Sequence, residues 1–178
     1  GAPERVPERV PERVIVLRRW RDTDDVERLT EFLHEAYRPH AEAGLLYVAT
    51  HQNPETTRQR LGSGFACVAT LGDQYVATVT LAFWEQDDAK DPGCDWYRRR
   101  DVAHFNQFAV APSLQGCGVG ARILDFLAGV SLGKEKTELA CDTSEHAAQL
   151  IGWYERRGFR RVDMADWRPK VNYKSVVL

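Results

Sequence analysis

The sequence has no apolar run approaching the ~18 consecutive residues that a membrane-spanning helix needs, and its N-terminus lacks the apolar core of a secretory signal. Neither sign of charge dominates, because 24 Lys and Arg residues against 26 Asp and Glu residues give a formal net charge of -2. This balance gives no support for a general nucleic-acid binder or a polybasic membrane anchor. We therefore expect a cytoplasmic protein whose partners include neither nucleic acid nor a membrane.

Cysteine is also scarce and scattered. Cys67, Cys94, Cys117 and Cys141 form no Cys-x-x-Cys pair, and the five histidines do not cluster with them. Because a zinc site needs clustered ligands, we expect no metal and four reduced thiols. With 43% hydrophobic and 28% charged residues, the 178-residue chain can bury a core as a single domain without disulfides.

The first residues differ in composition from the rest. Pro-Glu-Arg-Val occurs three times in succession between Pro3 and Val14. A proline at every fourth position cannot continue a helix and cannot donate evenly to a sheet. Residues 1–13 are therefore expected to form an extended arm on its own domain or on a second subunit, which makes a homodimer one expectation. The folded domain would span residues 14–178.

Hydrophobic periodicity and turn residues predict alternating strands and helices after the arm. Strands are predicted at residues 14–20, 65–71, 75–84, 103–110, 137–142, 160–164 and 172–177, and helices at 22–38, 53–61, 118–131 and 145–157. Pro39 is expected to end the first helix, Gly72 to turn a hairpin, and Gly158 to end the last helix. The order predicts an α/β fold, a single domain with a mixed central sheet of about seven strands and helices on both faces.

A glycine-rich turn provides the sharpest local signal for function. Residues 115–120 read Gln-Gly-Cys-Gly-Val-Gly between a predicted strand and a long helix. Glycine permits a tight turn and a close ligand, and the free N–H groups at a helix start suit a pyrophosphate. A turn that binds nothing is the structural alternative. A nucleotide-binding oxidoreductase is disfavoured, because the third glycine of the dinucleotide pattern is missing.

Two motifs in the expected order carry a resemblance to a known family. Residues 115–120 match the Gln/Arg-x-x-Gly-x-Gly/Ala motif of the GCN5-related N-acetyltransferase (GNAT) family, and residues 108–112 look like its fourth strand. Further along, residues 153–159, Trp-Tyr-Glu-Arg-Arg-Gly-Phe, resemble its Tyr-Glu-x-x-Gly-Phe signature. The resemblance extends from residue 14 to residue 178 and implies the GNAT fold, with acetyl-CoA as co-substrate and no metal.

The resemblance also implies roles for particular residues. Backbone groups of Phe108 and Val110 would bind the pantetheine arm, amides from Gly116 onward would hold the pyrophosphate, and Tyr154 would protonate the departing thiolate. A family asparagine is missing, and Ser144 or His146 would replace its contact with CoA. The implied cofactor-binding residues are Phe108, Ala109, Val110, Gln115, Gly116, Cys117, Gly118, Val119, Gly120, Ala121 and Ser144.

An amine nucleophile is protonated at neutral pH, so an enzyme of this class needs a base or a water chain. Strand alternation places His104, Asn106, Phe108 and Val110 on one face, and histidine is well suited to accept a proton near pH 7. A structural histidine is an equal alternative. Glu85, at the end of the 75–84 strand, is the second candidate base.

The function expected from these residues is transfer of an acetyl group from acetyl-CoA to a primary amine by direct attack in a ternary complex. The acceptor would be a small molecule or a peptide, bound by the first helices and the polar segment 85–100. The alternative is a non-catalytic acyl-CoA-binding or sensing module with the same fold.

Overall fold

The computed structural model describes residues 14–83 and 94–178, so the Pro-Glu-Arg-Val arm and the candidate base Glu85 lie outside the described residues. Strands and helices follow one another as β1 (Ile15–Arg19), α1 (Val26–Glu42), α2 (Val48–His51), α3 (Pro54–Gly62), β2 (Phe65–Leu71), β3 (Gln74–Phe83), β4 (Val102–Val110), α4 (Val119–Gly133), β5 (Glu138–Ala140), β6 (Asp142–Ser144), α5 (Ala148–Glu155), β7 (Asp163–Ala165) and β8 (Ser175–Val177). Short 3-10 turns occupy Trp96–Arg98 and Pro112–Leu114.

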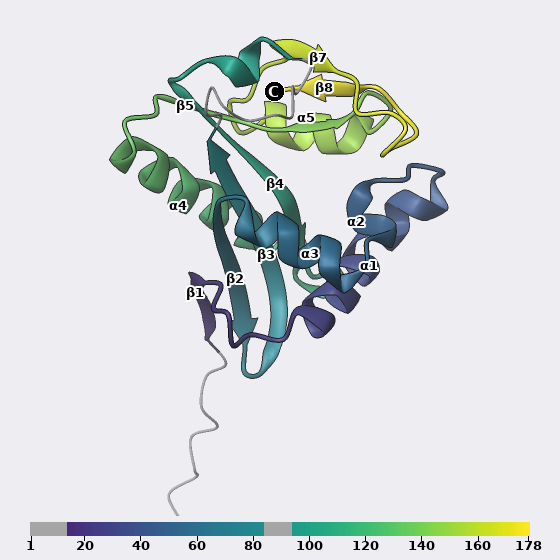
Figure 1. Cartoon of the computed structure of the whole chain (residues 1–178), viewed down its shortest axis with the longest axis vertical. Helices are drawn as coiled ribbons and strands as arrows, with labels where there is room; N and C mark the ends of the chain where they lie inside the picture. Colours follow the sequence, from purple (N-terminus) through teal and green to yellow (C-terminus); the bar gives the residue numbers. More distant parts are fainter. Residues whose placement is uncertain (1–13, 84–93) are drawn as a thin grey trace, which may run out of the picture.

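The strands form two sheets (Figure 1). A five-stranded sheet has the order β1-β2-β3-β4-β5, antiparallel except for the parallel pair β4–β5, and a three-stranded antiparallel sheet has the order β6-β8-β7. The predicted α/β fold is confirmed. The strand expected at residues 137–142 is divided at Cys141, because the chain leaves β4 there and pairs with β8.

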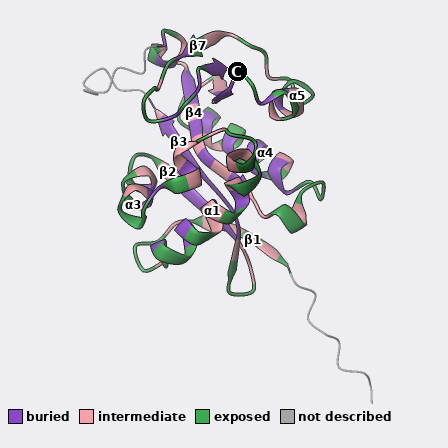
Figure 2. Ribbon diagram, turned by 90° about the vertical axis from the view of Figure 1, so that its right-hand side faces the viewer, coloured by how far each residue is buried: buried purple, intermediate pink, exposed green. Residues whose placement is uncertain are grey.

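Helices cover both faces of the five-stranded sheet, as the sequence predicted. Alternate residues of β2 point to opposite sides: Cys67 joins a core with Ile123 of α4, whereas Val68 joins a second core with Leu29 and Leu33 of α1. Figure 2 shows the strands mostly buried and the outward helix faces exposed. Across residues 14–83 and 94–178, no helix is both long and apolar enough to cross a bilayer.

Helix α1 continues through Pro39 to Glu42, so the prediction that Pro39 ends it is wrong. Proline removes its own N–H from the helix ladder, but the Pro39 carbonyl still accepts a hydrogen bond from the Ala43 N–H at 3.1 Å. The extra turn carries His40, which lines the main cleft of the molecule.

Other local signals fold as predicted. Asn53 caps α3 by accepting a hydrogen bond from the Thr56 N–H at 2.9 Å. Gly72, with a φ of 62°, turns the β2–β3 hairpin, and Gly158, with a φ of 92°, follows the end of α5. The short helix α2 has no counterpart in the sequence prediction.

The start of α1 is anchored to β1 by a charged pair. The Arg18 guanidinium donates two hydrogen bonds to the Asp24 carboxylate, at 2.7 and 2.8 Å, and Asp24 also accepts from the Arg21 N–H at 2.7 Å. The hydrogen bonds from Arg18 lower the pKa of Asp24 from its usual range. A carboxylate held in this way stabilises the folded state above its unfolded pKa, and the stabilisation is lost as pH falls through the folded pKa.

We therefore expect Asp24→Asn to reduce the free energy of unfolding by about 1–2 kcal/mol at pH 7. The difference from wild type should begin to shrink below about pH 4, where Asp24 of the unfolded chain becomes protonated, and should shrink further as pH falls through the lowered pKa of the folded state. Urea unfolding at pH 7 and pH 3 measures both values. The control is Glu55→Gln, which removes an exposed pair with Arg58 and should change stability by less than about 0.5 kcal/mol. An equal loss at both pH values would contradict the electrostatic account.

Candidate functional site

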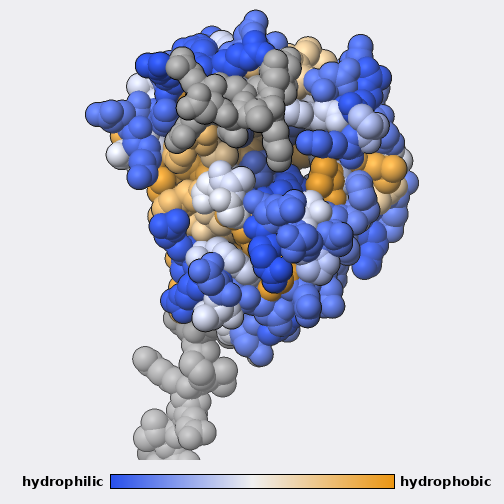
Figure 3. All heavy atoms as spheres, viewed as in Figure 1, coloured by the Kyte–Doolittle hydropathy of each residue, from blue (hydrophilic) through white to orange (hydrophobic). Residues whose placement is uncertain are grey.

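The site is the opening where β4 and β5 separate. They pair only from Val102 opposite Glu138 to His104 opposite Ala140, after which β4 continues to Val110 without β5 beside it. The cleft that results has a volume of about 1920 Å³. Ordinary ligand pockets measure roughly 300–1,000 Å³, so this cleft has room for an extended molecule and a second, smaller one. Figure 3 shows hydrophobic residues in the gap between the helices and the small sheet.

A bulge in β4 shapes the floor of the cleft. Two residues of β4, Gln107 and Phe108, lie opposite one residue of β3, and Gln107 has a φ of 51°. Such a backbone conformation is uncommon for a side-chain-bearing residue and needs support from its surroundings. Gln52 Nε2 donates to Gln107 Oε1 at 2.9 Å, and the Tyr37 hydroxyl donates to the Phe108 carbonyl at 2.6 Å. Both contacts hold the bulge from the α1–α3 side.

The bulge overturns one expectation about β4. Phe108 and Val110 pack on the same core as Phe105, so they lie on the face opposite His104 and Asn106. The prediction that all four even-numbered residues share a face is wrong, because an inserted residue reverses the alternation beyond it.

The start of α4, on one wall of the cleft, has features that favour a bound anion. Gly116 and Gly118 both have a φ of 80°, a conformation that glycine adopts without strain, and the helix begins immediately after Gly118. The amides of residues 119–121 have no acceptor inside the helix, and the helix dipole favours negative charge there. A Cβ on Gly120 would lie 3.1 Å from the Trp153 ring, so a larger residue there would require that ring to shift by a few tenths of an ångström.

Most of the predicted cofactor-binding residues border this cleft. Those that line it are Phe108, Ala109, Val110, Gln115, Gly116, Gly118, Val119, Gly120 and Ala121. Cys117 is exposed on the turn and is not among the lining residues. Ser144 is fully buried in the small sheet, where its hydroxyl accepts a hydrogen bond from the His146 N–H at 3.1 Å.

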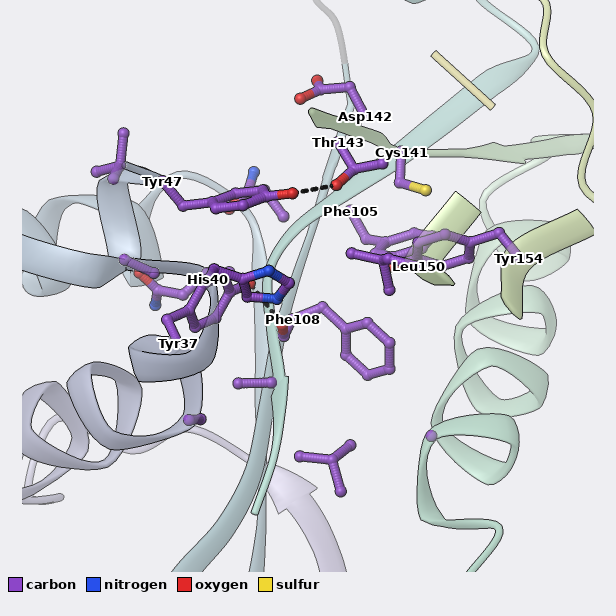
Figure 4. A pocket seen from close by; sticks show the side chains of 18 of the residues that line it. Tyr37, His40, Tyr47, Phe105, Phe108, Cys141, Asp142, Thr143, Leu150 and Tyr154 are labelled. Carbon is purple, nitrogen blue, oxygen red and sulfur yellow. Dashed lines mark hydrogen bonds between the residues drawn. The ribbon is translucent and has the colours of Figure 1, made fainter. Parts of the chain in front are cut away.

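Tyr154 of α5 projects into the cleft opposite α1 and α2 (Figure 4). Its side chain is buried among Phe105, Trp153 and Phe159. Burial raises the pKa of the Tyr154 hydroxyl well above its usual value, and the neighbouring Cys141 thiol adds to the increase. The hydroxyl therefore keeps its proton over the whole physiological pH range and can act as a proton donor.

His104 lines the cleft beside Tyr97 and Asp142. Its ring stacks on Tyr97 with 4.7 Å between the ring centroids, and the Tyr97 hydroxyl donates to Asp142 Oδ2 at 2.8 Å. Trp167 Nε1 lies 3.3 Å from the same oxygen. Burial raises the pKa of Asp142, although the two donors partly offset that effect. Asp142 was not among the predicted bases; its only signal in the sequence is a carboxylate that directly follows an apolar strand.

The wall opposite Tyr154 is aromatic, and the sequence analysis did not identify it. Rings from α1, the segment before α2 and the segment before β8 meet there with centroids 4.8–5.6 Å apart. They belong to Tyr37, His40, Tyr47 and Tyr173. The Tyr47 hydroxyl lies 2.6 Å from Thr143 Oγ1, which links this wall to β6 (Figure 4). The rings come from distant parts of the sequence, so no local pattern indicates them.

The cleft thus borders the free amides at the start of α4, an open strand edge, the protonated Tyr154 and the polar group around His104. Within the part of the chain that the structure describes, no cluster of His, Cys, Asp or Glu could hold a metal ion. Residues 25–159 match the acetyltransferase (GNAT) family. The chain belongs to this family, and the resemblance seen in the two sequence motifs is confirmed.

Solved structures of this class share the fold. A GNAT family acetyltransferase from Elizabethkingia anophelis with acetyl-CoA bound superimposes with a TM-score of 0.63 at 16% identity, covering 92% of this chain and 95% of that one. An IAA acetyltransferase from Bacillus cereus gives a TM-score of 0.62 at 16% identity, covering 92% and 97%. Identities this low show the fold alone. A comparison with curated proteins gave no match.

The anion site at α4 yields a binding prediction. CoA at about 100 times its dissociation constant should stabilise the wild type by roughly 2.7 kcal/mol. Gly118→Asp places a negative charge where the pyrophosphate is expected and should abolish the increase in melting temperature. The control is Gly129→Asp, which adds the same charge at an exposed position of α4 away from its N-terminus and should retain the shift. A wild-type melting temperature that does not respond to millimolar CoA would disprove this assignment.

Proposed function

We propose that the protein transfers an acetyl group from acetyl-CoA to a primary amine by direct attack within a ternary complex. The observation that carries the proposal is the single cleft at the β4–β5 separation, which has an anion site at one end and titratable side chains at the other. One cleft that borders both kinds of group suits a reaction between two molecules bound together, because it places the reacting atoms side by side.

The cofactor half is built largely from backbone. The edge of β4 beyond His104 has no β5 partner, so an extended pantetheine arm could bind it as an added strand. The amides at the start of α4 would hold the pyrophosphate. Tyr37 already donates to the Phe108 carbonyl, which leaves one lone pair of that oxygen for a ligand. Bound acetyl-CoA would supply an acetyl group activated as a thioester.

Side chains of this chain would handle the protons. Attack forms a bond between the amine nitrogen and the acetyl carbon and breaks the bond from that carbon to sulfur. His104 is proposed to take the proton that the amine loses, with Tyr97 holding the imidazole in place by stacking. Tyr154 is proposed to give its proton to the departing sulfur, a role that its protonated, buried hydroxyl supports.

An amine panel tests the proposal and its alternative together. Purified protein is mixed with acetyl-CoA and with small amines, amino acids or peptides, and release of the CoA thiol is followed. Amine-dependent release supports an enzyme. CoA binding without release for any amine would favour the non-catalytic acyl-CoA-binding or sensing module.

We expect Tyr154→Phe to keep the fold, because it removes only the hydroxyl from an aromatic core, and to slow transfer by about 10²–10⁴. The loss should be smaller for an acetyl thioester whose thiol has a lower pKa, since that thiolate departs without a proton. Single-turnover rates with both thioesters measure the difference. Phe159→Leu, which alters the same aromatic cluster without a titratable group, should not distinguish the two thioesters. Full single-turnover activity in Tyr154→Phe would mean that the hydroxyl is structural.

We expect His104→Gln to lower turnover by about 10²–10⁴ at pH 7 while CoA binding is retained. Part of the activity should return at high pH, where the amine acceptor loses its proton without help. The pH–rate profiles of both proteins provide the measurement. A profile unchanged from wild type would exclude His104 as the base and leave Asp142, Glu85 or an ordered water for that role.

A further inference from the structure

Arg60, near the end of α3, lines the cleft without an acidic partner. Its Nη1 donates to Gln52 Oε1 at 2.8 Å, and no Asp or Glu among the described residues lies within ion-pair distance of its guanidinium. Arg18 contrasts with it, because that guanidinium is neutralised by two hydrogen bonds to Asp24. Arg58, two residues before Arg60, is solvent-exposed and pairs with Glu55.

An unpaired guanidinium in such a place is costly. Burial lowers the pKa of Arg60, which reflects the loss of water around its charge. Guanidinium carries five N–H donors in a planar fork, of which the contact with Gln52 uses one. Arg60 is half-buried, and a charge that is partly withdrawn from water is stabilised where a partner of opposite charge meets it. The remaining donors suit a carboxylate, which can accept two parallel hydrogen bonds from the fork.

We call the part of the cleft bordered by the aromatic wall the acceptor half, and Arg60 lines the same cleft. Arg60 lines the same cleft as Tyr37, Tyr173 and Asp142, and the negative charge of Asp142 partly offsets the lowering of the Arg60 pKa by burial. In Figure 4, Tyr37 lies on the α1 side and Asp142 on the β6 side, with Tyr47 between them in this view. The anion site for the pyrophosphate is formed by different elements, the 115–118 turn and α4. Arg60 is therefore available to a second molecule.

Two further groups nearby have unused bonding capacity. Tyr173 is buried, with 7% of its surface exposed, and its ring packs on Tyr47. Its hydroxyl makes no hydrogen bond to residues 14–83 and 94–178. Asp142 receives both of its donors on Oδ2, which leaves Oδ1 open for an N–H group. The acceptor half thus offers donors for an anion and an acceptor for a cation.

We propose that Arg60 binds the carboxylate of the acceptor, so that the acceptor is an amino acid or a close amino-carboxylate analogue. Tyr173 provides a second donor to that carboxylate, and Asp142 attracts the ammonium group before it loses its proton. This inference rests on the proposed acetyl transfer and names its substrate class. A polyamine or another purely cationic acceptor would meet the Arg60 charge and be disfavoured.

Matched ligands test the inference on the wild-type protein. The twenty amino acids and their methyl esters are compared in the thiol-release assay; the ester keeps the amine and removes the negative charge. At least one amino acid should exceed its ester in kcat/KM by about 10-fold or more. Equal rates for every pair, or a general preference for esters or polyamines, would overturn the inference while leaving acetyl transfer in place.

Variants then assign the preference to Arg60. Arg60→Gln should raise KM for the amino acid by about 10-fold or more. It should leave KM for the ester, and the single-turnover rate constant at saturating acceptor, nearly unchanged. Arg60→Lys should give a KM for the amino acid between those of wild type and Arg60→Gln, because lysine keeps the positive charge but lacks the paired N–H donors of the guanidinium. The control Arg58→Gln should behave as wild type. A CoA-induced thermal shift equal to that of wild type shows that each variant is folded. If folded Arg60→Gln still prefers the amino acid to its methyl ester as strongly as wild type does, the assignment to Arg60 is overturned.

A binding measurement separates failure of the inference from failure of the proposed function. The same amino acids are titrated by calorimetry into CoA-loaded wild type and Arg60→Gln. If no amine releases thiol, the proposed function fails, but amino-acid binding that disappears in Arg60→Gln still supports a carboxylate site. Binding by neither protein, or equal binding by both, rules that site out.

Discussion

The parallel contact between β4 and β5 is the constraint on which the rest of the site depends. It extends over three residue pairs and ends at His104 and Ala140. If the two strands stayed paired to the end of β4, the strand edge and the cleft beside it would not exist. An open edge is ordinarily a liability, since unpaired N–H and C=O groups attract other strands. Here helices from both faces flank the edge, so access is limited to the cleft.

The separation is maintained from two directions. On one side, the chain after Cys141 pairs with β8, which draws it away from β4. On the other, Gln52 and Tyr37 hold the β4 bulge, whose left-handed residue Gln107 would otherwise relax. The contacts that open the cleft are thus hydrogen bonds between elements far apart in sequence. The same contacts fix Phe108 on the face of Tyr154 and leave His104 on the other.

Features of the fold and of the candidate site could be predicted from the sequence where they depend on neighbouring residues, and not where they depend on residues far apart in the chain. The cap at Asn53 and the turns at Gly72 and Gly158 depend on a few neighbouring residues, and the sequence indicated each of them. The β4 bulge depends on Gln52, 55 residues away, and no local pattern marks it. Pro39 misled the prediction because it removes only the hydrogen bond of its own N–H, while its carbonyl still accepts from the Ala43 N–H and the last turn closes. For the site, the glycine turn and Tyr154 were found by their motifs, whereas Arg60, Asp142 and the aromatic wall were not.

The cofactor half and the acceptor half of the cleft also differ in whether their residues lie close together in the sequence. The proposed cofactor half consists of backbone amides and glycines within one short segment, so a compact sequence motif can indicate it. The acceptor half relies on side chains from α1, α3, β6 and the segment before β8, each held by packing rather than by a local rule. The turn at α4 is formed by different residues, so under the proposed function substitutions in the acceptor half would alter acceptor binding without disturbing that turn. A fold can therefore keep one co-substrate while its acceptor varies, and the identity of the acceptor must be sought in charges such as Arg60 and Asp142 rather than in the motif.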